Sequence, residues 1–473
     1  MSDNLNIYFK SDSNNEYIFD SDTSIIFEKN HYEKRIEKIT RIKRVYHNKK
    51  YDSKDYKIQD IEKYIMRFGL REMILEVTNS CNFRCKYCIF SKYYPNHSKL
   101  QNKNMPFETA QKAIDIYISL LEKGKLYNPE RSPVIGFYGG EPLLNFECIK
   151  KCVDYIKQRY HGSIIFTITT NAYLLNDEIS RFMIKNNFIP IFSLDGPRII
   201  HDRNRRLIED KETFEQVYQN ILNYTSINNS LAWVNSTYDY ETDIEELMNF
   251  WCYQNNMRLL SLSPVNPYGT YYYSQFNNET IKNFLEKKKK LYNYFHNLLS
   301  KNGKLTLKEI KEINFLNIFL GRSIFSVYMK QMFSNTSRNI IKCTGSCVPG
   351  EKIFINVDGN MYPCEKVDQS MIIGDTKRGL DYSSIYRYMK EFDEKVTSSC
   401  ENCSVQNVCS LCYQVLHNKK GFCKNEQYCI EMRDYYKEML SQAVSLSEKN
   451  PGYFLEFTTK YYQELKELAV IFK

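Results

Sequence analysis

Cysteine is the residue that most constrains what this chain can fold into. The 473 residues include fifteen cysteines, and nine of them fall between Cys343 and Cys429. The chain begins MSDNLNIYFK, without the basic and then apolar regions of a secretory signal, so we expect a cytoplasmic protein. Large intracellular proteins rarely use disulfides, and cysteines clustered in this way therefore indicate metal ligands.

Composition and charge exclude several classes of protein. Hydrophobic residues make up 42% of the chain and charged residues 26%, which is typical of a folded globular protein. No run approaches the roughly 18 apolar residues of a membrane helix, so we expect no membrane partner. Lys and Arg exceed Asp and Glu by only 65 to 56, and this diffuse net charge of +9 does not favour nucleic acid.

Short apolar stretches alternate with amphipathic stretches between residues 71 and 263. Six such βα-type units predict parallel strands joined by crossover helices, and six is short of the eight that close a full barrel. We expect an α/β fold, a partial (β/α)6 barrel whose active site lies at the carboxyl ends of the strands. The predicted strands are 73–78, 134–138, 164–170, 189–194, 231–236 and 258–263; the predicted helices are 106–121, 146–158, 177–185, 213–224 and 242–253.

The other regions predict smaller units around this barrel. The first 69 residues combine three strand-like stretches with a Lys/Arg-rich helical stretch, and they are either a simple extension or a peptide-docking module. A cysteine-rich region contains one hairpin, with Asp358–Gly359 as its turn. The expected organisation is an α+β N-terminal unit over 1–69 with strands at 5–10, 16–20 and 24–28, a barrel over 70–270, a helical bridge over 271–342, a cysteine-rich domain over 343–430 and a helical tail over 431–473.

Cys81, Cys85 and Cys88 directly follow the first predicted barrel strand, with C-x3-C-x2-C spacing. Iron–sulfur clusters are held by cysteine thiolates, and three thiolates leave one iron of a [4Fe–4S] cluster open to a small molecule. A structural zinc site would need a fourth protein ligand, and none is nearby. The motif resembles the signature of the radical S-adenosylmethionine (SAM) enzymes, which implies a SAM-binding [4Fe–4S] cluster.

Polar clusters follow the next strands, where ligands gather in parallel α/β folds. In the resembling enzymes, the segment matching Gly139-Gly140-Glu141-Pro142 holds the methionine amino group of SAM. Segments matching Ser-Leu-Asp-Gly-Pro and His-Asp-x-x-Arg contact its ribose and carboxylate, and Ser193 and Arg205 are the matching positions. We expect His201 to be a loop histidine bonded to a neighbour. The remaining candidates for cofactor binding are Thr170, Asn171 and Asp195.

The C-terminal cysteines allow two interpretations. By spacing, Cys400, Cys403, Cys409 and Cys412 are compatible with a zinc ribbon. The Gly359-x4-Cys364 hairpin and the C-x2-C-x5-C run instead resemble the SPASM domain, which implies two auxiliary [4Fe–4S] clusters and three clusters in all. The implied ligands are Cys343, Cys347, Cys364 and Cys412 for the first auxiliary cluster, and Cys400, Cys403, Cys409 and Cys429 for the second, with Cys423 spare. The x2 spacing before Cys412, where x3 is commoner, leaves open whether Cys343 or Cys423 is a ligand.

The resemblance implies reductive cleavage of SAM to a 5′-deoxyadenosyl radical and oxidative modification of a precursor peptide, by a thioether or carbon–carbon crosslink. Glu365, directly after Cys364, is the candidate base. The alternatives are a sulfatase-maturase-like enzyme that converts Cys or Ser to formylglycine, and a zinc-binding interaction protein. We expect a precursor peptide and an electron donor such as flavodoxin or ferredoxin as partners. Eighty residues before Cys81 favour an enzyme that docks a leader peptide.

Overall fold

The structure is a computed structural model, and the chain divides into two compact units. It describes residues 6–333, apart from 22, 35–36, 39–55, 96, 98 and 302–304, and residues 347–456, apart from 401, 407, 410 and 454. We call residues 62–290, 348–385 and 468–473 the barrel unit, and residues 1–61, 291–347 and 386–467 the terminal unit. In the described part of the chain, no helix is long and apolar enough to cross a membrane.

Six parallel strands form the centre of the barrel unit, in the order in which they occur along the chain. Each strand pairs in parallel with the next, as the alternating sequence pattern predicts. The strands are β4 (Glu72–Thr78), β5 (Val134–Gly139), β6 (Ile165–Thr170), β7 (Phe188–Ser193), β8 (Ala232–Tyr238) and β9 (Met257–Pro264). The predicted partial barrel is therefore confirmed.

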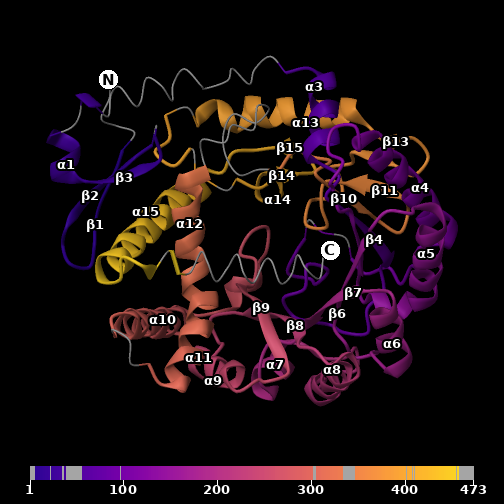
Figure 1. Cartoon of the computed structure of the whole chain (residues 1–473), viewed down its shortest axis with the longest axis horizontal. Coiled ribbons are helices and arrows are strands. Elements are labelled where there is room, and N and C mark those ends of the chain that lie inside the picture. Colours follow the sequence, from indigo (N-terminus) through magenta and orange to yellow (C-terminus); the bar gives the residue numbers. More distant parts are fainter. Residues whose placement is uncertain are drawn as a thin grey trace. The chain divides into compact units, whose positions relative to one another are not determined.

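Amphipathic helices cover the outer face of this sheet (Figure 1). They are α4 (Phe107–Gly124), α5 (Phe146–Arg159), α6 (Asp177–Lys185), α8 (Phe214–Asn228) and α9 (Ile244–Cys252). Cys148, Cys152 and Cys252 lie buried on these helices, where the sequence suggests small apolar residues. The sequence analysis missed α7 (Arg198–Asn204), because its polar residues are buried and give no amphipathic pattern.

A hairpin from the cysteine-rich region extends the barrel sheet. Strand β10 (Lys352–Ile355) pairs in parallel with β4 and in antiparallel with β11 (Asn360–Tyr362), and β12 (Gly374–Asp375) and β13 (Gly379–Leu380) follow. The predicted turn is present, and Gly359 has a φ of 85° there. The sequence predicted the hairpin but not its pairing with the first barrel strand, because register between distant segments has no local signal.

The terminal unit combines a small sheet with helices. Strands β1 (Ile7–Lys10), β2 (Glu16–Asp20) and β3 (Ile25–Glu28) form an antiparallel sheet at the predicted places. Helix α15 (Glu426–Lys449) packs against β1 and α12 (Arg322–Phe333), and Asp12 N donates to Ser445 Oγ over 2.8 Å. The remaining elements of the chain are α1 (Lys29–Lys34), α3 (Ile58–Phe68), α10 (Asn278–Leu299), α11 (Leu307–Leu316), α13 (Tyr382–Lys395), α14 (Tyr413–Leu416), β14 (His417–Asn418) and β15 (Gly421–Phe422).

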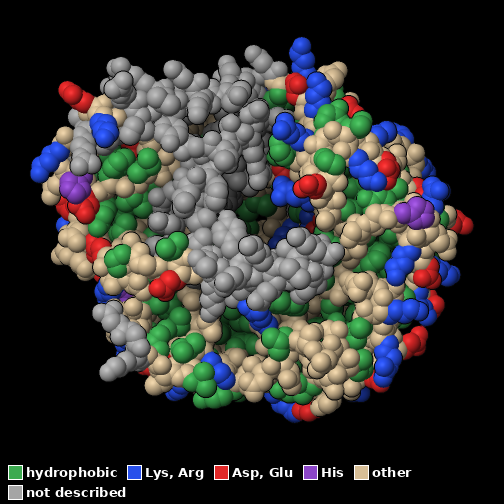
Figure 2. Space-filling model, in the orientation of Figure 1, with side chains coloured by type: hydrophobic (Ala, Val, Ile, Leu, Met, Phe, Trp, Pro, Cys, Tyr) green, Lys and Arg blue, Asp and Glu red, His purple; other side chains and the backbone are tan. Residues whose placement is uncertain are grey.

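Charges of both signs are interspersed over the visible surface (Figure 2). The diffuse charge expected from composition is consistent with this view.

Candidate active site

The loop after β4 carries the three cysteines of the C-x3-C-x2-C motif within eight residues. Burial raises the pKa of Cys81, and the charges of Cys85, Glu141 and Cys88 raise it further. Burial likewise raises the pKa of Cys85 to about 12. Thiols in this environment lose their protons only against a positive charge such as bound iron. Three partly exposed thiols on one loop supply the ligand type of the three-thiolate site of a [4Fe–4S] cluster, although no three His, Cys, Asp or Glu side chains in the described part of the chain already lie as the ligands of a metal ion do.

A second segment, residues 204–208, holds this cysteine loop in place. Arg84 N donates to Arg206 O over 2.8 Å, and Lys86 N donates to Asn204 O over 3.0 Å. Phe83, which is buried, forms an isolated bridge with Leu207. The loop therefore has strand-like backbone support although it belongs to no strand.

Two glycines at the end of β5 pack against the backbone that leads into Cys81. A Cβ on Gly140 would lie 2.1 Å from Ser80 O, and one on Gly139 would lie 2.1 Å from Thr78 O. Gly140 N donates to Thr78 O over 3.0 Å. These glycines let β5 approach the chain's own cysteine loop, and their expected role in binding SAM remains a prediction.

Glu141 joins the ends of β5 and β6. Its buried carboxylate accepts hydrogen bonds from Leu143 N (3.0 Å), Thr170 Oγ1 (2.6 Å) and Asn171 N (2.7 Å). Burial raises its pKa, and these hydrogen bonds oppose that shift. Pro142 is buried at the start of the following turn. These hydrogen bonds let Glu141 join the two strand ends, and its expected role in binding SAM remains a prediction.

Asn171 connects these strand ends to the cysteine loop. Its Nδ2 donates to Asn82 Oδ1 over 2.9 Å, within the C-x3-C-x2-C motif. The structure thus brings the predicted segments after β4, β5 and β6 to one place at the carboxyl edge of the sheet, as the parallel topology predicts.

The buried Asp195 and Arg205 and the half-buried Tyr87 form a hydrogen-bonded chain near Cys85. Tyr87 OH donates to Asp195 Oδ2 over 2.5 Å and accepts from Arg205 Nη1 over 2.9 Å. The Arg205 guanidinium lies 5.7 Å from the Phe83 ring centroid, and its buried Nε has no hydrogen-bond partner among the described residues. A buried, unpaired guanidinium N–H beside three thiols is suited to an anionic ligand group. Ser193 is the last residue of β7, two residues before Asp195, and it is half-buried.

His201 lies buried on helix α7 and not on a loop as we expected, but it is bonded to its neighbours as predicted. Asp195 N donates to its Nδ1 over 3.3 Å, and Thr213 Oγ1 lies 3.2 Å from its Nε2. Burial holds its pKa well below the usual range, so the ring is neutral. His201 therefore supports the Asp195 backbone and is not a candidate for acid–base chemistry.

Glu365, the candidate base, is held by a lysine that the sequence analysis missed. Lys352 Nζ lies 3.0 Å from Glu365 Oε2 and 3.1 Å from Glu72 Oε2. Burial lowers the pKa of Lys352, but the two carboxylates outweigh it and the net shift is upward. Burial raises the pKa of Tyr138, and the charges of Glu365 and Cys88 raise it further. This tyrosine therefore lies near both the candidate base and the cysteine loop. No sequence motif marks Lys352, Tyr138 or the hydroxyl of Tyr87.

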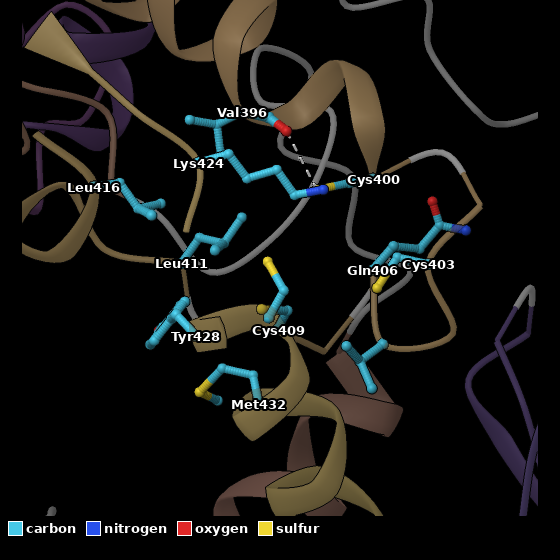
Figure 3. A pocket seen from close by; sticks show the side chains of 12 residues that line it. Val396, Cys400, Cys403, Gln406, Cys409, Leu411, Leu416, Lys424, Tyr428 and Met432 are labelled. Carbon is cyan, nitrogen blue, oxygen red and sulfur yellow. Dashed lines mark hydrogen bonds between the residues drawn. The ribbon is translucent and has the colours of Figure 1, made fainter. Parts of the chain in front are cut away.

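Four C-terminal cysteines line one pocket of the terminal unit (Figure 3). They are Cys400, Cys403, Cys409 and Cys429, the set expected for the second auxiliary cluster. Burial and the charge of Cys403 raise the pKa of Cys400 to about 11. The other lining residues are mostly apolar, and Lys424 extends toward Cys400 (Figure 3). Cys423 is exposed and does not line this pocket. The assignment of these four thiols as ligands remains a prediction.

The expected ligands of the first auxiliary cluster are divided. Cys343 lies outside the described residues. Cys347 and the exposed Cys412 belong to the terminal unit, whereas Cys364 belongs to the barrel unit. This ligand set also remains a prediction.

The barrel region of the chain is similar to known proteins. A family profile described as the Radical SAM superfamily matches residues 75–250. The uncharacterised protein MJ0907 of Methanocaldococcus jannaschii is 39% identical over 132 residues, 28% of this chain and 41% of that protein. The chain thus spans less than half the length of that relative.

Longer alignments link the chain to two enzymes. The radical SAM cyclopropyl synthase TigE of Paramaledivibacter caminithermalis is 27% identical over 74% of this chain and 70% of TigE. A cysteine-type anaerobic sulfatase-maturating enzyme of Clostridium novyi is 24% identical over 72% of this chain and 87% of that enzyme.

A solved structure shares the fold. Native anSMEcpe with bound AdoMet superposes with a TM-score of 0.53 at 17% identity, over 82% of this chain and 99% of that chain. The six parallel strands, the cysteine loop after the first of them and the matched profile lead to one conclusion: this chain contains a domain of the Radical SAM superfamily.

Proposed function

We propose that this protein is a radical SAM peptide maturase, which modifies a precursor peptide oxidatively. The observation that carries the proposal is the C-x3-C-x2-C loop at the carboxyl end of β4, with three partly exposed thiols and with the buried Arg205 near Cys85 and Cys88. When bound, a [4Fe–4S] cluster and SAM supply one-electron cleavage of the sulfonium and a 5′-deoxyadenosyl radical able to abstract hydrogen.

The barrel residues bind and orient this cofactor pair. Cys81, Cys85 and Cys88 hold three irons and leave the fourth accessible. Arg205 donates its free Nε–H to an anionic group of SAM, and Tyr87 fixes the guanidinium by its hydrogen bond over 2.9 Å. Glu141 keeps the ends of β5 and β6 at the cysteine loop through its three accepted hydrogen bonds.

Glu365 takes the proton that an oxidised substrate must lose. Lys352 orients its carboxylate through the ion pair at 3.0 Å, and Tyr138 lies near both Glu365 and the cysteine loop. The four-cysteine pocket of the terminal unit would hold an auxiliary [4Fe–4S] cluster, and such a cluster would supply an acceptor for the electron that an oxidised peptide gives up.

A crosslink is the leading product, a thioether or a new carbon–carbon bond. The relationship to TigE supports the second form, because a cyclopropyl ring requires a new carbon–carbon bond. The N-terminal residues 1–69, with their three-stranded sheet, would dock the leader of the precursor. Formylglycine formation is the alternative, supported by the alignment with the sulfatase-maturating enzyme.

The test is product analysis with anaerobically reconstituted enzyme. The enzyme would be incubated with SAM, a reductant, and either the short peptides encoded beside its gene or a sulfatase-derived peptide. Loss of two hydrogen atoms with a linkage resistant to hydrazine supports a crosslink, whereas an aldehyde trapped by hydrazine supports formylglycine. Metal analysis that finds zinc without iron or sulfide would contradict both and favour a zinc-binding interaction protein.

A further inference from the structure

Lys424 is the one side chain with a permanent charge among the described residues that line the four-cysteine pocket. Apart from the thiols and Gln406, the other lining residues are aliphatic or aromatic: Val396, Val405, Leu411, Leu416, Tyr428 and Met432. A charge in such a lining acts through a lower effective dielectric than a charge in water. Lys424 therefore influences a group held by these thiols more strongly than a surface lysine would.

The backbone is anchored on both sides of Lys424. Before it, Cys423 N donates to Leu416 O over 2.8 Å at the end of the β14–β15 hairpin. After it, the Asn425 side chain caps helix α15. The first turn of α15 also carries Cys429, whose N donates to Asn425 O over 3.1 Å. One short stretch of anchored backbone thus positions both the lysine and a pocket thiol.

The charge of Lys424 acts on two of the pocket thiols. Its side chain extends toward Cys400 (Figure 3). Burial raises the pKa of Cys400 and of Cys429, and the positive charge of Lys424 opposes both shifts. Lys424 Nζ also lies 2.9 Å from Glu426 Oε1, and the Glu426 side chain is exposed. The lysine is therefore paired with a solvent-facing acid while its charge reaches two predicted cluster ligands.

The pocket supplies the ligand type of a [4Fe–4S] cluster, four cysteine thiols in a largely apolar lining. In the described part of the chain, no three His, Cys, Asp or Glu side chains already lie as the ligands of one metal ion do. Four thiolates around a [4Fe–4S] cluster bind four separate irons, so they lie further apart than the ligands of one ion. The reduction potential of such a cluster depends on the charges and hydrogen-bond donors near its sulfurs.

We propose that Lys424 raises the reduction potential of the auxiliary cluster in the four-cysteine pocket and so makes this cluster an effective electron acceptor. This inference rests on the proposed function, in which the peptide is oxidised. A thiolate-bound cluster gains one negative charge on reduction, and a fixed cation near its ligands stabilises that reduced state. After hydrogen abstraction, the peptide radical gives one electron to the cluster and one proton to Glu365. Lys424 keeps its own proton and forms no bond, so it is a positioning residue that acts through the cluster.

The experiment measures the midpoint potential of this cluster in the full-length, anaerobically reconstituted protein. Samples poised with dithionite and redox mediators are followed by electron paramagnetic resonance, and the signal that Cys429→Ala removes identifies the cluster. The variants are K424Q, K424R and E426Q, and iron content is measured for each. K419Q is the matched control, because it removes a positive charge from the exposed turn between β14 and β15, outside the pocket lining.

We expect K424Q to retain its iron and to shift the cluster about tenfold or more toward its oxidised form, a fall of about 59 mV for each factor of ten in a one-electron couple. K424R keeps the charge and should stay within about twofold of wild type. E426Q removes a negative charge beside the lysine, so its potential should rise, by a smaller factor because Glu426 is exposed. K419Q should match wild type. With SAM and peptide, K424Q should give less modified peptide for each 5′-deoxyadenosine formed.

An unchanged potential in K424Q with its iron retained would overturn the proposal. Shifts of the same sign in K424Q and E426Q would overturn it as well, because the removal of opposite charges would then act through the structure. If K424Q loses its iron, E426Q decides the test, and an unchanged potential in E426Q contradicts the proposal. A wild-type protein without any signal that Cys429→Ala removes would instead overturn the auxiliary cluster of the proposed function, so the two failures are distinguishable.

Discussion

The two cysteine sites of this chain are built in different ways. Cys81, Cys85 and Cys88 come from one loop of eight residues, and polar groups such as the half-buried Tyr87 and the buried Arg205 lie near this loop. The pocket of the terminal unit takes its four cysteines from residues 400–429, and mostly apolar side chains separate it from water. Three thiols in a polar setting leave room for a ligand that carries charge, whereas four thiols in an apolar setting suit a cluster closed by the protein.

The largest expected effect breaks the first site. Replacing Cys81, Cys85 and Cys88 together by Ala should remove about a third of roughly twelve irons, four for each of three clusters, and abolish formation of 5′-deoxyadenosine. Iron analysis and chromatography of the SAM products measure both. A triple variant that still cleaves SAM would show that the radical chemistry starts elsewhere. The exposed Cys423, changed to Ala, is the control for loss of a thiol as such.

Breaking the second site should uncouple SAM cleavage from modification of the peptide. Cys429→Ala should lower the iron content and stop product formation, while SAM is still cleaved without modifying the peptide, because the barrel site remains complete. Cys423→Ala should have little effect, since this residue does not line the pocket. The ratio of 5′-deoxyadenosine to modified peptide measures the uncoupling. Equal damage in the two variants would refute the ligand assignment.

These two sites also show what the sequence could and could not predict. The three-cysteine loop was predictable because its ligands are adjacent and follow a strand, so local spacing determines the geometry. The order of the six parallel strands followed from alternating periodicity for the same reason. The pairing of β10 with β4, the ion pair of Lys352 with Glu365 and the bonds of Glu141 join distant segments, and no local pattern encodes them.

Gly140→Ala sharpens the comparison by disturbing only the barrel site. Its Cβ would lie 2.1 Å from Ser80 O and 3.0 Å from Cys81 Cβ, so the backbone at the cysteine loop must move. We expect a loss of about 1–3 kcal/mol in the free energy of unfolding, as for overpacking of a core, and a lower iron content. Gly452→Ala is the matched control, because its Cβ would meet no atom closer than 3.4 Å. Equal stability of the two variants would mean that the close approach of β5 does not matter.

The smallest effect is a pH dependence that belongs to the barrel unit. Glu76, on β4, is buried, and burial raises its pKa to about 7, although hydrogen bonds from Val357 N and Asn79 oppose the shift. A carboxyl group whose pKa is higher in the folded protein than the unfolded value of 4.5 contributes stability when the pH is below 4.5. This contribution is lost as the pH rises through about 7, the pKa of Glu76 in the folded protein.

Glu76→Gln removes this titration, so the sign of its effect depends on pH. Relative to wild type, the variant should become more stable between about pH 5 and pH 8, by at most about 3 kcal/mol, the free energy equivalent of the shift. Thermal unfolding of the full chain at both pH values measures the difference. The exposed Glu130, changed to Gln, should follow wild type at each pH. A wild-type midpoint no more sensitive to pH than that of Glu76→Gln would mean that Glu76 is ionised in the folded barrel, its burial outweighed by the Val357 and Asn79 hydrogen bonds.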